Sequence, residues 1–127
     1  MFIPYNPTPE SLNTTDCTVR AITKATGKTW DEAYAGLAAQ GFILKRMPSN
    51  KSVWDAYLRR EGFKRHLIDC GPYCEYTVKD FCRDNPKGTF ILALDDHVIC
   101  IKDGSYYDTW DSGLEIPVYC WARQDES

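Results

Sequence analysis

The chain has 127 residues, of which 43% are hydrophobic and 13% aromatic, and its formal net charge is −3. This length suits one domain with a single core, and the composition excludes a disordered chain. The acidic balance argues against a broad nucleic-acid-binding face, and the longest apolar run, TFILAL, is far too short to span a membrane. We therefore expect one domain over 1–127, with an irregular lead-in at 1–13 and a frayed tail at 124–127.

Four helices are predicted in the first two thirds of the chain. The residues from Thr14 to Asp16 can each cap the first helix, which ends at Gly27. Thr29 and Glu32 form a capping box that opens the second helix. The predicted ranges are 14/16–27, 29–41, 52–62 and 77–84. Between the third and fourth helices, the alternating segment 63–69 is expected to be an edge strand, with His66 half-exposed on it.

From Gly88 onward the helical period gives way to strands rich in β-branched and aromatic residues. The predicted strands are 89–94, 97–101, 105–110 and 117–123. Asp103 and Gly104 form a two-residue turn that tolerates the positive φ of a type I′ hairpin. The fold class is therefore α+β, with N-terminal helices packed on a C-terminal antiparallel β-sheet.

The hairpin register brings two polar residues together. If Lys102 pairs with Ser105, then His97 and Asp108 lie on one face as diagonal neighbours, because side chains alternate along a strand. Asp111 has the opposite parity. The register thus predicts that the Asp108 carboxylate holds the His97 imidazole, which is the arrangement that a general base needs.

A His–Asp pair needs a nucleophile, and Cys17 is the candidate among six cysteines. It falls in the first turn of a predicted helix, where free N–H groups and the helix dipole favour a thiolate. Its backbone N–H can supply half of an oxyanion hole. Cys82, Cys100 and Cys120 lie inside apolar patterns and are interpreted as structural. The alternative is that one cysteine, one histidine and one aspartate occur together by chance.

The order of these residues resembles that of a known family. The segment DCTVRAI opens a helix, and HVICIKDGSYYDTWD follows much later in the chain. Together they look like the papain-like cysteine peptidase superfamily. More closely, they are similar to small papain-like proteins of bacteriophages and prophages and to bacteriocin-leader-processing (C39-like) peptidases. The DC and HV pairs are also similar to those of the NlpC/P60 cell-wall peptidases.

The resemblance implies a papain-like fold, with Cys17 as nucleophile, His97 as general base and acid, and Asp108 as the orienting carboxylate. Papain-like enzymes often carry a glutamine six residues before the cysteine, which completes the oxyanion hole. Ser11 occupies that position here, and the nearest amide is Asn13. The expected oxyanion hole is therefore Asn13 with the backbone of Cys17.

The leading hypothesis is a cysteine-dependent hydrolase that cleaves a peptide or isopeptide bond through an acyl-enzyme. The alternatives are a non-catalytic papain-like binding protein, such as a phage-encoded host-factor binder, and an acyl transferase with the same triad. The expected partner is a protein or peptide substrate, held in part by Trp110 and Tyr107, with no nucleic acid and no membrane involved.

No cofactor and no metal are expected. His66, Cys70 and Cys74 follow one another at four-residue intervals, but no CxxC accompanies them as in most structural zinc sites. The N-terminus lacks the basic and apolar regions of a signal peptide, so a cytoplasmic location is expected, in the host cytoplasm if a phage encodes the chain. Nothing in the sequence indicates the oligomeric state.

Overall fold

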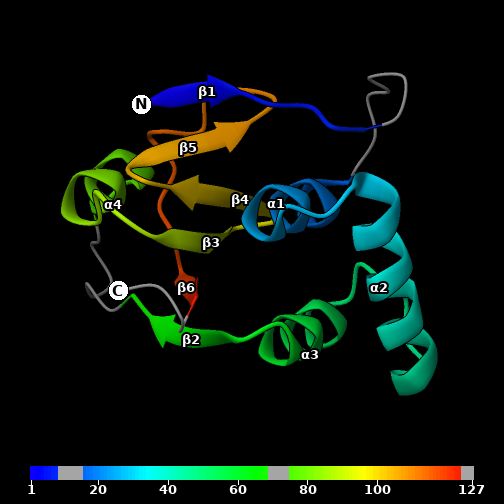
Figure 1. Ribbon diagram of the computed structural model, residues 1–127. Coiled ribbons are helices and arrows are strands. Elements are labelled where there is room, and N and C mark those ends of the chain that lie inside the picture. Colours follow the sequence, from blue (N-terminus) through cyan, green and yellow to red (C-terminus); the bar gives the residue numbers. More distant parts are fainter. Residues whose placement is uncertain (9–15, 69–74, 124–127) are drawn as a thin grey trace.

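A computed structural model describes residues 1–8, 16–68 and 75–123. In it a six-stranded mixed sheet carries helices α1, α2 and α3 on one side and α4 on the other (Figure 1). The helices are α1 (Cys17–Thr26), α2 (Trp30–Leu44), α3 (Lys51–Arg60) and α4 (Val78–Asp84). The strands are β1 (Phe2–Pro4), β2 (Phe63–Leu67), β3 (Thr89–Leu94), β4 (His97–Lys102), β5 (Ser105–Asp108) and β6 (Tyr119–Arg123). The expected α+β class is confirmed.

The first two helices begin at the predicted caps, α3 begins one residue and ends two residues earlier than predicted, and α2 ends later than predicted. Thr29 and Glu32 form both hydrogen bonds of a capping box at the start of α2. We expected α2 to end at Gly41, and this was wrong, because the helix continues to Leu44 and closes at Lys45 with φ 57°. A Cβ on Gly41 would lie 2.6 Å from the Arg46 carbonyl oxygen. Gly41 therefore allows the backbone at Arg46 to approach the helix closely, and it does not end the helix.

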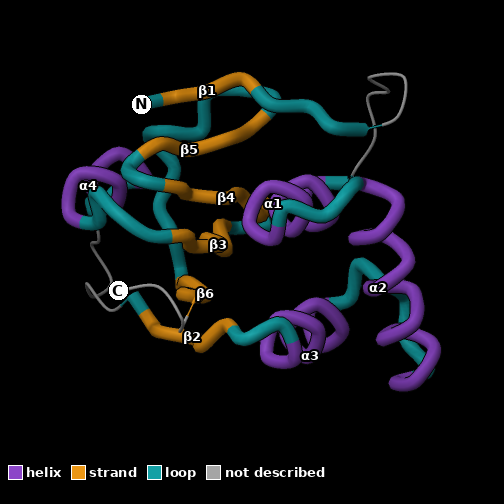
Figure 2. Tube along the Cα trace, in the orientation of Figure 1, coloured by secondary structure: helices purple, strands orange, loops and turns teal. Residues whose placement is uncertain are grey.

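The sheet has the order β1-β5-β4-β3-β6-β2, so β2 lies at an edge as predicted (Figure 2). Two expectations were wrong. Residues 2–4, placed in an irregular lead-in, form β1, and β1 pairs with β5 in parallel, so the sheet is not purely antiparallel. The Tyr106 N–H donates to the Met1 carbonyl at 3.0 Å, and the Tyr5 N–H to the Asp108 carbonyl at 2.8 Å. Pairing with a distant strand thus outweighs the local effect of proline.

The hairpin of β4 and β5 has the predicted register. Lys102 pairs with Ser105, and the two turn residues between them have φ of 49° and 78°. A type I′ turn requires positive φ at both positions. The strand β5 ends at Asp108, two residues earlier than expected, and β6 begins at Tyr119, not at 117.

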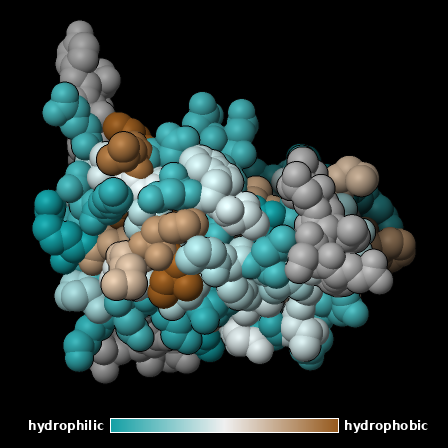
Figure 3. Space-filling model, turned by 90° about the horizontal axis from the view of Figure 1, so that it is seen from above, coloured by the Kyte–Doolittle hydropathy of each residue, from teal (hydrophilic) through white to brown (hydrophobic). Residues whose placement is uncertain are grey.

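Each face of the sheet has its own hydrophobic core. One cluster packs beneath α1, α2 and α3 around the fully buried Trp121, and the other beneath α4 around the buried Tyr106. Cys82, Cys100 and Cys120 are buried in these clusters, consistent with structural roles. Viewed from the β1 side, hydrophobic residues form separate patches on a largely hydrophilic surface (Figure 3). No helix in the described ranges is both long and apolar enough to cross a membrane.

Candidate active site

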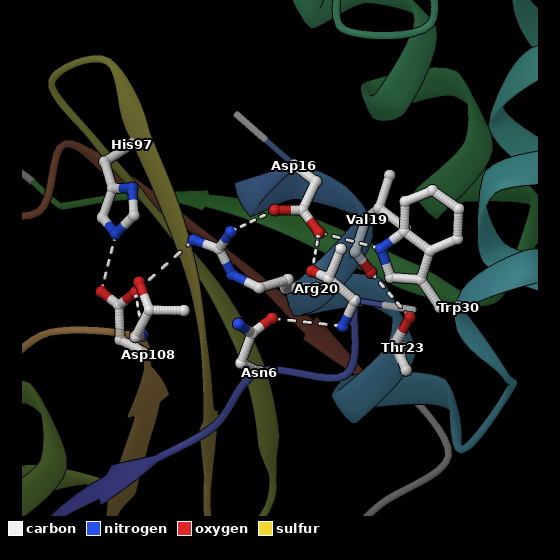
Figure 4. A network of polar contacts seen from close by, with 10 residues as sticks. Asn6, Asp16, Val19, Arg20, Thr23, Trp30, His97 and Asp108 are labelled. Carbon is white, nitrogen blue, oxygen red and sulfur yellow. Dashed lines mark hydrogen bonds and ion pairs between the residues drawn. The ribbon is translucent and has the colours of Figure 1, made fainter. Parts of the chain in front are cut away.

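Three elements meet at one end of the sheet: the first turn of α1, the start of β4 and the end of β5. They carry Cys17, His97 and Asp108 respectively. The close-up in Figure 4 shows His97 directed at Asp108, with Arg20 reaching Asp108 from α1. Residues separated by up to 91 positions in the chain therefore contribute to one polar cluster.

The Asp108 carboxylate holds the His97 ring. Nε2 of His97 lies 2.6 Å from Oδ2 of Asp108, and the Asp108 side chain is 1% exposed. The Ser112 hydroxyl donates to Oδ2 at 2.8 Å, and the Thr109 N–H donates to Oδ1 at 2.8 Å. Hydrogen bonds therefore hold both oxygens of the carboxylate in place, and the fixed carboxylate orients the imidazole.

The Cys17 thiol lies in the same cleft as this imidazole. Interactions with His97, with the backbone of Val98 and with the Thr18 side chain lower the pKa of the thiol. Because Nε2 of His97 is engaged by Asp108, Nδ1 is the ring nitrogen left for the thiol. Cys17 is only partly buried, unlike the other cysteines in the described part of the chain. This is the chain of contacts that activates a nucleophilic cysteine.

The two groups shift each other's protonation. Burial raises the pKa of Cys17, but the hydrogen bonds from His97 and Val98 outweigh burial, and the net pKa lies below its ordinary value. Burial lowers the pKa of His97, whereas the hydrogen bonds to Asp108 and Cys17 raise it to about 9. A lowered thiol pKa beside a raised imidazole pKa favours a thiolate–imidazolium pair near neutral pH.

The side chain of the N-cap residue does not cap the first turn of α1. Asp16, at the N-cap, makes no side-chain capping hydrogen bond, so this carboxylate does not occupy the N–H groups of the first turn. The backbone N–H of Cys17 is one of these groups, and its expected part in an oxyanion hole stays a prediction. Asn13, the other expected member of the oxyanion hole, lies outside the described residues, as do Ser11, Cys70 and Cys74.

A buried ion-pair network supports the site, and the sequence analysis missed it. Arg20 is 9% exposed, pairs with Asp16 one helical turn earlier, and has its Nη2 3.7 Å from Oδ1 of Asp108. The Trp30 indole N–H donates to Asp16 at 2.8 Å, and the Thr8 hydroxyl donates to the same carboxylate (Figure 4). Burial raises the pKa of Asp16, but these donors and Arg20 bring it below its ordinary value. The i,i+4 spacing of Asp16 and Arg20 was the signal in the sequence.

A cleft of about 550 Å³ opens at Cys17 and His97. Its floor includes Trp54 and Tyr119, whose rings stack at 6.1 Å, and both residues are at least 95% buried. Lys51 lines one part of the cleft, with its Nζ 4.5 Å above the Tyr119 ring. The cleft therefore joins the reactive groups to an aromatic floor, a setting typical of ligand sites.

The two aromatic residues expected to bind substrate are not in the described lining of the cleft. Trp110 is 46% exposed and stacks on the His97 ring with a centroid separation of 5.1 Å. Tyr107 packs against Tyr5, and the Nζ of Lys24 lies 4.4 Å from its ring centroid. Neither is among the described residues that line the cleft. Trp110 instead covers the His97 imidazole.

No cluster of histidine, cysteine and carboxylate side chains in the described ranges has the make-up of a metal site. Comparison of the chain with protein-family models, with curated proteins and with solved structures finds no match. The assignment of the site therefore depends on its own geometry and chemistry.

Proposed function

We propose that this protein is a papain-like, cysteine-dependent hydrolase that cleaves a peptide or isopeptide bond through an acyl-enzyme. The observation that carries the proposal is the placement of three side chains. Cys17 and His97 line one cleft, where interaction with His97 lowers the pKa of the thiol, and Nε2 of His97 lies 2.6 Å from the buried carboxylate of Asp108. The nucleophile stands at a helix N-terminus, as in the family that the sequence resembles.

In the first half of the reaction, the Cys17 thiolate attacks the substrate carbonyl carbon, and the π electrons of the carbonyl move to its oxygen. The N–H groups of the first turn of α1 stabilise this oxyanion. When the tetrahedral intermediate collapses, the bond to the leaving nitrogen breaks and the imidazolium of His97 gives that nitrogen its proton. A thioester on Cys17 and a free amine result.

In the second half, His97 removes a proton from water as the water oxygen attacks the thioester. Collapse of this second intermediate releases the carboxylic acid and restores the Cys17 thiolate and the imidazolium. Asp108 stays ionised throughout and stabilises the charged ring. If an amine takes the place of water in this step, the same residues perform acyl transfer.

The proposal is tested with p-nitrophenyl acetate. We expect a burst of one p-nitrophenolate per chain, followed by slow turnover, with the acetyl group located on Cys17 by peptide-mapping mass spectrometry. Cys17→Ala abolishes the burst, and His97→Ala slows it by at least tenfold. Acetylation spread over several cysteines, or no burst, would refute the proposal. Faster release on adding glycinamide, with formation of acetylglycinamide, would identify the transferase variant of the chemistry.

A further inference from the structure

A second cavity adjoins the nucleophile on the side away from the sheet. It measures about 210 Å³ and lies between α1, α2 and the segment that follows α2. Its apolar walls are Val19, Trp30, Tyr34 and Leu37. We call this cavity the Trp30 pocket.

The Trp30 pocket adjoins the cleft at Cys17 and His97. Thr18 and Ser49 line both cavities. Asp16 and Thr18, the chain neighbours of Cys17 on either side, also line the Trp30 pocket. A substrate whose carbonyl lies at the Cys17 thiol can therefore extend past Thr18 and place a neighbouring side chain in this pocket.

The walls of the pocket favour an apolar occupant. The rings of Trp30 and Tyr34 stack at 5.3 Å with an angle of 13°, yet Tyr34 remains 47% exposed. Half-exposed aromatic rings beside a cavity gain most from a ligand that covers them. The volume is also sufficient, since a cavity of about 150 Å³ with aliphatic and aromatic walls holds a benzene molecule.

Among the described residues of the lining, Asp16 is the one charged group. The carboxylate of Asp16 already accepts hydrogen bonds from Thr8, Arg20 and Trp30. An apolar side chain meets no unpaired charge in the described lining, and its burial against Val19 and Leu37 is favourable. The pocket therefore selects by size and hydrophobicity.

We propose that the Trp30 pocket is a specificity site that receives a large apolar side chain, aromatic or branched aliphatic, of a peptide substrate whose carbonyl reacts with Cys17. This inference rests on the proposed function and names its substrate class. The indole of Trp30 serves twice, because its ring forms a wall of the pocket and its N–H holds Asp16 beside the nucleophile. The wall is thereby fixed before the substrate arrives, which favours binding.

The test uses alkylating probes of graded length. The rate constant for alkylation of Cys17 is measured by mass spectrometry with iodoacetamide, with N-phenylalkyl iodoacetamides of one to four methylenes, and with N-alkyl iodoacetamides of matched length without the ring. We expect one phenyl probe to react at least tenfold faster than its ring-free counterpart, because burial of a phenyl group is favourable.

Variants on the exposed face of α2 assign the effect to the pocket. We expect Tyr34→Ala to reduce the rate advantage of the phenyl probe at least fivefold and Tyr34→Phe to retain that advantage. Iodoacetamide should react with Cys17 of both variants at the wild-type rate. Phe42→Ala is the matched control, since Phe42 lies on the same helix, is 73% exposed and does not line the pocket.

The outcomes separate the two proposals. If Cys17 reacts rapidly with iodoacetamide but no phenyl probe exceeds its ring-free counterpart by more than twofold, the specificity site is refuted and the proposed function stands. If Cys17 reacts with iodoacetamide no faster than an ordinary thiol, the proposed function fails. A phenyl advantage that disappears in Tyr34→Ala would still support the pocket as a binding site in that case.

Discussion

Replacement of Asp108 by asparagine removes the charge that orients and protonates His97 while preserving the size of the side chain. The carboxylate lies 2.6 Å from Nε2 of His97 and is almost fully buried, so solvent does not replace it. In Asp108→Asn, burial of the ring still lowers the pKa of His97, and the largest interaction that raises it is gone. We expect the pKa of His97 to fall from about 9 toward its ordinary value of 6.5.

The size of the effect follows from this shift. A group with a pKa of about 9 is roughly 97% protonated at pH 7.5, and one with a pKa of 6.5 is roughly 10% protonated. The thiolate–imidazolium pair at Cys17 then becomes about tenfold less populated, so acylation slows at least tenfold. Loss of the correct imidazole tautomer can enlarge the fall to about 10⁴-fold, as in serine proteases.

The assay combines an NMR titration of the His97 imidazole with the acylation rate of Cys17. The second imidazole signal, from His66, is assigned with a His66→Asn variant. Asp111→Asn is the matched control, because Asp111 accepts hydrogen bonds from the Tyr106 hydroxyl and the Gly113 N–H, not from His97. The reasoning would be refuted if His97 had the same pKa in wild type and in Asp108→Asn. It would also be refuted if Asp108→Asn and Asp111→Asn slowed the acylation of Cys17 equally.

Three further changes test other parts of the account. Arg20→Gln leaves the buried carboxylate of Asp16 without its cation and leaves Asp108 with His97 alone. We expect it to lower the free energy of unfolding in urea by about 3 to 5 kcal/mol, whereas a loss below about 1 kcal/mol would contradict the network. Gly113→Ala places a Cβ against the Tyr106 hydroxyl, and we expect a loss of about 1 to 3 kcal/mol in thermal unfolding, with an unchanged stability counting against this packing. Trp110→Ala uncovers the His97 ring and is expected to slow acylation several-fold, with Trp110→Phe retaining most of the rate; equal rates in all three proteins would exclude a positioning role.

The part of the site within the hairpin could be predicted because it depends on local rules. An Asp-Gly turn fixes the register of β4 and β5, and alternation of side chains then separates Asp108 from Asp111. The structure bears out this choice, since Asp108 contacts His97 and Asp111 contacts Tyr106. The helix that begins at Cys17 follows equally local signals, namely a run of capping residues and the glycine at its end.

The remaining features depend on contacts between distant parts of the chain. The strand β1 forms only because β5 offers it an edge, and nothing in a segment with proline at position 4 predicts that pairing. In the sequence, Arg20 is one cation among others in an amphipathic helix. Its role depends on the fold, which places Asp108 next to it. The Trp30 pocket likewise requires the packing of α1 on α2, which helix periodicity does not specify.

The most direct test of the central claim is the pH profile of Cys17 alkylation by iodoacetamide in wild type and in His97→Ala. In wild type the contact with His97 lowers the pKa of the thiol, so the midpoint of the profile should lie below that of the variant. In the variant, the midpoint of the profile should approach that of an ordinary thiol, about 8.5. If the two proteins share one midpoint near that value, Cys17 and His97 do not form a catalytic pair, and the proposed enzyme is contradicted.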